Sequence, residues 1–336
     1  FTELAASELL SRVREFVADL ADGIIATELR VAFPNGLTQH HRENLPAARE
    51  AIDEITCSTI HGFCQRLIKP YPAEANIDPG ASVMDRNQAD LTFLEIIDGC
   101  LRERLSDGQD GILAEMVLHS PGETVALIHK IAENLRRRPT LAAPPVSLLD
   151  DHLAAFRKAA ADFAGFMDGL AAAEPETVTI VERLSEMAAA LANGPDPEAP
   201  AGLVHLLTSR PHPDLCTKAG TFASYRKTGK WATAAKQAGL SKADGDRLND
   251  AAKAHYTACC KAWVALVQAA AGHALAALIG EARPILQRYR DHKRASAQLD
   301  FDDLIFAARD LLRDHDAVRR ALGQRFAHVL VDEFQD

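Results

Sequence analysis

Several features that would narrow the class of this protein are missing from its sequence. The six cysteines include no C-x-x-C pair and no cysteine–histidine spacing suited to zinc. This pattern argues against a zinc site and favours a reducing compartment, the cytoplasm. The formal net charge is −10, which argues against a protein that binds nucleic acid by bulk positive charge, although a local basic surface can coexist with an acidic total.

Uninterrupted apolar runs are also scarce. The longest stretch, AWVALVQAAAGHALAALIG at residues 262–280, is rich in alanine and is interrupted by Gln268 and His273. It predicts a buried helix rather than a membrane span. No signal peptide is visible. Because the chain begins at Phe1 and opens directly on a helical pattern, we interpret it as a piece of a longer protein.

A phosphate-binding P-loop, G-x-x-x-x-G-K-[ST], is missing as well. At the Gly229–Lys230 step, Trp231 follows where serine or threonine is required, and Ser224 stands at the first glycine position. We therefore expect that this chain cannot hold a nucleoside triphosphate by itself.

What the sequence does contain is mostly helical periodicity. The chain has 336 residues, of which 47% are apolar, enough for one large or two to three ordinary domains with real cores. Apolar residues recur at helical spacing over residues 2–20, from residue 58 to 68, and over residues 299–312. Between about Asp85 and Gln298 we find only helical signals, separated by proline-rich loops.

Two short segments have the composition of strands. EITCST at residues 54–59 leads into a helix, and AHVLVDE at residues 327–333 is a continuous apolar run typical of a strand buried in a parallel sheet. The predicted fold is therefore mainly α, with a partial α/β lobe interrupted by a large helical insertion.

Asp332 and Glu333 would stand where the second predicted strand leaves the sheet. Ligands of parallel α/β sheets bind beyond the carboxyl ends of the strands. In P-loop ATPases such an aspartate holds magnesium and the neighbouring glutamate activates water. The plain alternative is that these acids only mark the exit of a strand to solvent.

Four separated segments together resemble one known family. FTELAASELLSRV, STIHGFCQRLI, LDFDDLI and VLVDEFQD are similar, in order, to motifs of superfamily-one DNA helicases of the UvrD, RecB and AddA group. The sequence His-Gly-Phe-Cys at residues 61–64 favours the RecB or AddA type. The resemblance is specific over about residues 1–75 and 296–336 and only architectural in between.

The resemblance implies a domain plan. Residues 1–80 would begin a RecA-like motor lobe, residues 81–295 would form the helical insertion called the 1B domain, and residues 296–336 would return to the lobe and end at the Walker B motif. The whole protein would be an ATP-driven DNA translocase acting in double-strand break repair and recombination. It would have a P-loop upstream, a second motor lobe downstream and a partner subunit, and any nuclease domain would also lie downstream.

By the same resemblance, Asp332 would hold Mg²⁺ with ATP, Glu333 would activate water, and Gln335 would couple the nucleotide site to bound DNA. We expect no ATPase activity from these 336 residues alone.

The resemblance also implies DNA contacts. Thr2 begins a helix, where it is either an N-cap or a phosphate contact. Thr59, His61 and Gly62 form a strand-to-helix turn suited to the backbone of a single strand. We expect Phe63, which lies on the apolar stripe of its helix, to belong to the core.

Residues 218–242 contain basic and aromatic side chains but no acidic one. We predict DNA contact through Arg226, Lys227 and Lys230, with some base stacking on Tyr225 and Trp231. The alternative is a solvated loop and helix face.

Two further groups of charges are given structural roles. Asp302 and Asp303 are expected at a helix start, and Arg136 to Arg138 at a helix C-terminus. Two rival interpretations of the whole chain stay open at this point: a non-catalytic helical scaffold with a relic Walker B motif, and a DNA-binding module in its own right.

Overall fold

The computed structural model describes residues 3–108 and 110–332. The backbone divides into two compact units: unit 1 comprises Phe1–Thr92 and Arg290–Asp336, and unit 2 comprises Phe93–Tyr289. The division points fall inside two helices, α4 (Arg86–Ser106) and α11 (Lys242–Ala295). The domain boundaries predicted from the sequence lie near residues 80 and 295, and the roles assigned to those domains stay predictions.

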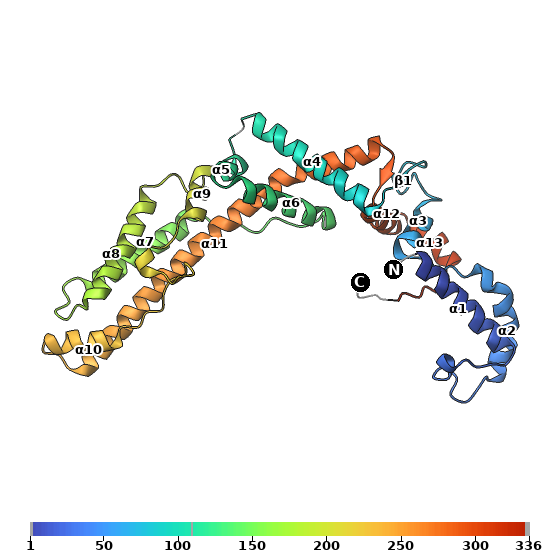
Figure 1. Cartoon of the computed structure of the whole chain (residues 1–336), viewed down its shortest axis with the longest axis horizontal. Helices are drawn as coiled ribbons and strands as arrows, with labels where there is room; N and C mark the ends of the chain where they lie inside the picture. The colour runs from blue at the N-terminus through green and yellow to red at the C-terminus, as the bar shows by residue number, and fades with distance from the viewer. Residues whose placement is uncertain (1–2, 109, 333–336) are drawn as a thin grey trace. The chain divides into compact units, whose positions relative to one another are not determined.

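Unit 1 is built from short helices and one minimal sheet (Figure 1). Its elements are α1 (Glu3–Ala21), η1 (Thr27–Leu29), α2 (Gln39–Glu50), η2 (Ala51–Glu54), α3 (Ile60–Ile68), β1 (Ser82–Val83), β2 (Gln298–Leu299), α12 (Phe301–Asp314) and α13 (Asp316–Arg325). The predicted helices at residues 2–20, 58–68 and 299–312 are confirmed as α1, α3 and α12, which begin one or two residues later than predicted.

The core of unit 1 lies between α3, α12 and α13. The apolar stripe of α3 buries Cys64, Leu67 and Ile68, and helical spacing on α12 and α13 brings apolar residues against it. Those residues are Leu304, Ala308, Leu311, Val318 and Leu322. Helix α1 packs against α2 but buries only Leu20 among its side chains, so it adds little to this core.

The strand predictions are wrong for the described residues. Residues 55–59 form no strand, and neither do residues 327–332, where Val329 and Leu330 are 59% and 97% exposed. A strand requires a neighbour that pairs its backbone N–H and C=O groups. In the part of the chain that the structure describes, only β1 and β2 pair, in parallel, with Ser82 opposite Gln298 and Val83 opposite Leu299.

Unit 2 is entirely helical apart from one antiparallel bridge between Cys216 and Phe222, as far as the structure describes it. Besides parts of α4 and α11 it contains α5 (Ile112–His119), α6 (Pro121–Arg137), α7 (Leu149–Met167), α8 (Pro175–Ala192), α9 (Pro200–Thr208), η3 (Pro213–Leu215) and α10 (Thr228–Gln237). The expectation of a helical block between Asp85 and Gln298 is confirmed.

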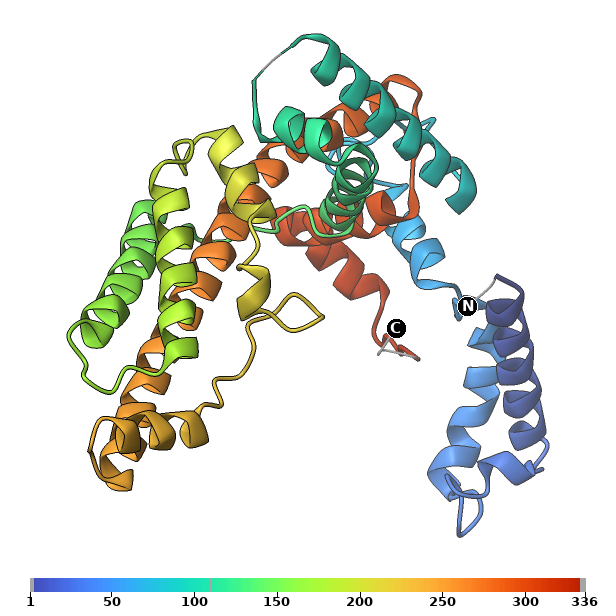
Figure 2. The same ribbon diagram turned by 60° about the vertical axis from the view of Figure 1, so that its left-hand side comes forward.

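Helix α11 is the central helix of unit 2, and the other helices pack along it. In both views α7 and α8 lie beside its first half and α4, α5 and α6 beside its second half (Figures 1 and 2). Its buried residues recur every three or four positions, among them Tyr256, Cys259, Trp263, Leu266 and Ala270, which is the spacing of one helix face.

Aromatic pairs fix the helices of unit 2 against α11. Phe156 of α7 meets Trp263 edge-on with ring centroids 5.2 Å apart, and Phe93 of α4 meets Tyr289 at 4.9 Å. The guanidinium of Arg136 lies over the rings of both Phe93 and Tyr289. Arg136 is in the last turn of α6, so the predicted helix C-terminus at these arginines is confirmed.

One described helix, α11, is long and apolar enough to cross a membrane, with a mean hydropathy of 1.7 over its most apolar window. Core helices of soluble proteins meet the same criteria. Trp263, Leu266, Ala270 and Leu278, which fall within the apolar stretch, are buried in the core of unit 2. One face of the stretch is therefore buried, as predicted, whereas Val264 and Leu275 are exposed.

Candidate nucleic-acid interface

The N-terminus of α3 contains three of the predicted DNA contacts. Thr59 is the N-cap, with extended backbone angles (φ −62°, ψ 159°), and its hydroxyl oxygen accepts a hydrogen bond from the backbone N–H of Gly62 at 3.0 Å. The same hydroxyl donates to Glu3 Oε1 of α1 at 2.8 Å. A carboxylate of the protein therefore lies at the helix end, the position that favours an anion.

Gly62 leaves room for this contact. A Cβ at this position would lie 3.0 Å from Glu3 Oε1 and 3.1 Å from Thr59 Oγ1. Any larger side chain would therefore have to shift the carboxylate or the capping hydroxyl. Glycine thus lets an anion approach the first turn of α3 closely.

His61 and Phe63 point to different surroundings. The imidazole of His61 is half-buried and meets the ring of Phe301 edge-on at 4.9 Å. Within the described part of the chain its ring nitrogens have no hydrogen-bond partner, which leaves them available to a ligand. Phe63 packs against the core of unit 1 and meets Phe326 at 5.4 Å, so its prediction as a core residue is confirmed.

The basic segment, residues 218–242, lies in unit 2 and is arranged differently from the prediction. Trp231 is fully buried and Tyr225 is 9% exposed, so the prediction that they stack on bases is wrong. Their large apolar surfaces favour burial in the core of unit 2, where both pack. Arg226 is exposed and has no partner among the described residues.

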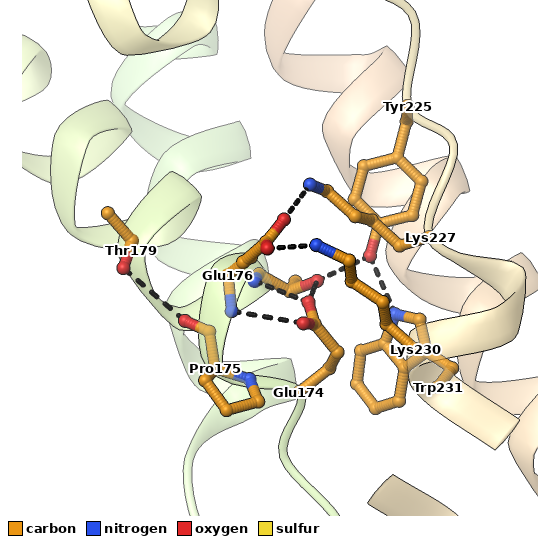
Figure 3. A network of polar contacts seen from close by, with 9 residues as sticks. Glu174, Pro175, Glu176, Thr179, Tyr225, Lys227, Lys230 and Trp231 are labelled. Carbon is orange, nitrogen blue, oxygen red and sulfur yellow. Dashed lines mark hydrogen bonds and ion pairs between the residues drawn. The ribbon is translucent and has the colours of Figure 1, made fainter. Parts of the chain in front are cut away.

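Lys227 and Lys230 converge on one carboxylate (Figure 3). Lys227 Nζ donates to Glu176 Oε2 and Lys230 Nζ to Glu176 Oε1. These hydrogen bonds, that of Lys227 first, lower the pKa of Glu176 to about 2. No sequence pattern indicated this partner, because Glu176 lies 51 and 54 residues away from the two lysines.

Beneath this ion pair lies a buried polar network. Glu174, 2% exposed, is the N-cap of α8, and its carboxylate accepts from the backbone N–H groups of Glu176 and Thr177 at 3.1 and 2.7 Å. The Thr177 hydroxyl bonds Tyr225 at 2.6 Å, and Trp231 Nε1 donates to the Tyr225 hydroxyl at 2.7 Å. The start of α8 is thus tied to the basic segment (Figure 3).

Sequence reasoning missed Glu174 and Thr177. A usable signal was present, since an acid followed by Pro175 at the first helical position is typical of a helix start. What that signal could not supply is the partner, Tyr225, which lies 48 residues from Thr177.

Asp300, Asp303 and Lys293 form a second charged cluster, in unit 1. Asp300 is the N-cap of α12 and forms a reciprocal capping box with Asp303. Lys293, 6% exposed, donates to both carboxylates. Burial and the nearby Asp300 raise the pKa of Asp303, and Lys293 opposes them. The prediction that Asp302 and Asp303 belong to a helix start is confirmed, but the cap itself is Asp300.

The Walker B prediction falls at the edge of the described residues. Asp332 is exposed at the end of segment 327–332. Thr2, Glu333 and Gln335 lie outside the described residues. Among residues 3–108 and 110–332, no group of three histidine, cysteine or acidic side chains is placed to hold a metal ion.

The predicted site residues therefore fall into separate groups. Thr59, His61 and Gly62 share the N-terminus of α3 in unit 1, and Arg226, Lys227 and Lys230 share the start of α10 in unit 2. In both places a carboxylate of the protein contacts a predicted DNA-binding residue.

Comparison with known proteins identifies the family. The family model described as the UvrD/REP helicase N-terminal domain matches residues 1–336, so the chain belongs to this family of helicases. The resemblance predicted from the four sequence segments is confirmed.

Among its curated relatives is the A-type subunit of the ATP-dependent helicase/nuclease of Desulforamulus reducens, which is 23% identical over 93% of this chain and 28% of that protein. The proteins of the same name from Moorella thermoacetica and Pediococcus pentosaceus are 28% and 30% identical over 31% and 34% of this chain, and over 9% and 8% of their own lengths. The chain thus spans less than a third of the length of these relatives.

Proposed function

We propose that the chain is the DNA-contacting part of an ATP-dependent DNA helicase of the RecB/AddA type that acts in double-strand break repair and recombination. The observation that carries this proposal is the family match over all 336 residues. The names of the relatives, which describe the A-type subunit of an ATP-dependent helicase/nuclease, support the AddA type. They also support a nuclease activity in the whole protein and a partner subunit. In this proposal the whole protein works in the cytoplasm on single-stranded DNA and duplex ends.

Membership of this family implies that the whole protein uses ATP and Mg²⁺. A carboxylate is a ligand that magnesium prefers, and Asp332 presents one at the end of an exposed segment. In this proposal Asp332 holds the magnesium, whose charge supports phosphoryl transfer when it is bound. Glu333 takes a proton from the attacking water, and Gln335 couples nucleotide and DNA binding.

Because the sequence contains no P-loop, we expect these 336 residues alone to hydrolyse no ATP. Phosphate release measured with malachite green, with and without single-stranded DNA, tests this expectation. Sustained release that DNA stimulates and an Asp332→Ala variant lacks would show that the expectation is wrong.

At the N-terminus of α3, Thr59, His61 and Gly62 contact the DNA backbone. The cap leaves a glycine beside an anion-favouring helix end, and the imidazole of His61 has free ring nitrogens among the described residues. Such contacts read the backbone rather than the base sequence. Thr2 joins them as a phosphate contact in this proposal.

In unit 2, Arg226, Lys227 and Lys230 supply the positive charge. They are neighbours at the start of α10 in an otherwise acidic protein, and exposed or half-buried cations of this kind bind phosphates. With Tyr225 and Trp231 in the core, the contact is electrostatic and does not include stacking by these two rings.

A salt titration of binding to an oligo-dT strand tests the DNA contact. Single-stranded binding weakens with salt with a slope of about 0.7 per phosphate contact. We expect Lys227→Gln together with Lys230→Gln to weaken binding and to reduce the slope by about 1.4. The matched control changes two exposed lysines elsewhere in unit 2, Lys130→Gln and Lys261→Gln. Equal slopes for both pairs would contradict the contact.

A further inference from the structure

Glu176 is the part of this surface that the proposed function does not explain. Its two carboxylate oxygens receive one lysine ammonium each, Oε2 from Lys227 and Oε1 from Lys230. Two adjacent oxygens bearing negative charge are also what a phosphodiester presents. The lysines therefore already hold, inside the protein, an anion of the shape and charge that a DNA backbone would offer them (Figure 3).

We propose that Glu176 is an internal competitor for DNA, which occupies Lys227 and Lys230 until a backbone phosphate displaces it. This inference rests on the proposed function, since it assumes that the two lysines contact DNA. Glu176 then sets how tightly the basic segment binds and makes that binding depend on a competition within the chain.

The exposure of the ion pair makes the exchange feasible. The side chains of Glu176 and Lys230 are 48% and 51% exposed, and that of Lys227 is 22% exposed. Ion pairs at such positions contribute little to stability because water screens them. A phosphate can therefore take the place of the carboxylate without a large loss of stability, and the released carboxylate can be solvated where it is.

The network below keeps the lysines in place during the exchange. Glu174 holds the start of α8, Thr177 bonds Tyr225, and Trp231 bonds the same Tyr225 hydroxyl. None of these bonds involves the side chain of Glu176. Release of its carboxylate therefore leaves the backbone on either side of Lys227 and Lys230 fixed.

Arg226 gives an incoming phosphate a first contact. It is exposed, precedes Lys227 directly, and has no ion-pair partner in the part of the chain that the structure describes. A strand held there would bring its next phosphates close to the two occupied lysines.

The test compares Glu176→Gln with Glu186→Gln in oligo-dT binding at fixed salt. Both variants replace a glutamate by glutamine and so change the net charge equally. Glu186 lies on the same helix and is similarly exposed, but it pairs with Arg183 and not with the two lysines. We expect Glu176→Gln to bind about fivefold more tightly than Glu186→Gln, which is the upper end of what one exposed ion pair contributes. Unchanged tryptophan fluorescence, to which the buried Trp231 and Trp263 both contribute, shows that the fold of unit 2 is retained.

A third variant separates this inference from the proposed function. Adding Lys227→Gln and Lys230→Gln to Glu176→Gln should abolish the gain. If the lysine changes weaken binding but Glu176→Gln and Glu186→Gln bind alike, the competition is absent while the DNA contact stands. If the triple variant binds as tightly as Glu176→Gln, the lysines do not contact DNA, and both the competition and the proposed lysine contact are wrong.

Discussion

The two units of this chain bury their apolar segments to different extents. In unit 2 a single long helix, α11, presents a continuous apolar face that the other helices cover, and aromatic pairs such as Phe156–Trp263 close the contacts. Unit 1 has a small core around α3 and α12, and its most strand-like segment, residues 327–332, leaves Leu330 97% exposed. Helical segments find their hydrogen bonds locally, whereas a strand depends on a neighbour.

The largest effect is expected from truncation of the core of unit 2. Trp231→Ala removes a fully buried side chain and the hydrogen-bond donor of Tyr225. We expect a loss of about 4 kcal/mol in the free energy of unfolding, measured by urea denaturation and far-UV circular dichroism. Val264→Ala on the exposed side of α11 serves as the control, with a change below about 1 kcal/mol. Similar losses for both variants would mean that Trp231 is not a core residue.

In unit 1 the strongest test is the buried cluster around Lys293. Lys293→Met leaves Asp300, 2% exposed, and Asp303 without their shared cation. Removal of one partner from a buried pair costs about 3 kcal/mol, and thermal unfolding should show it.

Asp300→Asn provides the matched test of this cluster. Asparagine also caps helices, so the double variant Lys293→Met, Asp300→Asn should regain part of the lost stability. A double variant less stable than Lys293→Met would show that the pair is not what stabilises the start of α12.

A smaller loss is expected at the N-terminus of α3. Thr59→Ala removes the cap that accepts from Gly62 N and the donor to Glu3, at a cost of about 1 kcal/mol. Thr59→Asp restores the cap but repels Glu3, so it separates the two contacts. The protection of the α3 amides against hydrogen exchange is measured in both variants. Equal protection in the wild type and Thr59→Ala would argue against the cap.

The ion pair of Glu176 predicts a dependence on acid pH. The folded-state pKa of Glu176 is about 2, below its ordinary value of 4.5. Because folding lowers the pKa of this carboxyl group, the ion pair stabilises the folded state at pH values above about 4.5. This contribution is lost as the pH falls from about 4.5 toward 2. Because water screens this pair, we expect Glu176→Gln to flatten this part of a stability–pH curve only slightly. Parallel curves for the wild type and Glu176→Gln would rule out the ion pair.

The smallest effect is expected in the exposed apolar segment of unit 1, residues 327–332. Leu330→Asp places a charge at a side chain that is 97% exposed, so the free energy of unfolding should change by less than about 0.5 kcal/mol. The same substitution in a buried strand would be strongly destabilising. A loss as large as that of Trp231→Ala would mean that residues 327–332 pair in a sheet.

Much of the helical architecture could be predicted from the sequence. The stripes of α1, α3 and α12 are visible as apolar residues three and four apart, because a helix face is a property of one short segment. The strands could not be placed in this way. β1 and β2 are two residues each and lie about two hundred residues apart in the chain, so only their mutual pairing defines them.

The candidate site, too, could be predicted only in part. Its residue types, the threonine before α3 and the lysines at the start of α10, could be found by composition and by resemblance. Their surroundings could not, because Glu3 and Glu176 reach them from segments more than fifty residues away. The sequence therefore predicted the threonine and the lysines as candidate contacts, but not the carboxylates that contact them.

The helices and the family follow from the sequence alone, since each depends on residues close together along the chain or on a recognisable motif. Three-dimensional packing was needed to bury Tyr225 and Trp231, to bring Lys227 and Lys230 onto one carboxylate, and to leave the apolar segment 327–332 exposed. Burial, ion pairing and strand formation all depend on partners brought from distant parts of the chain, and no local pattern specifies those partners.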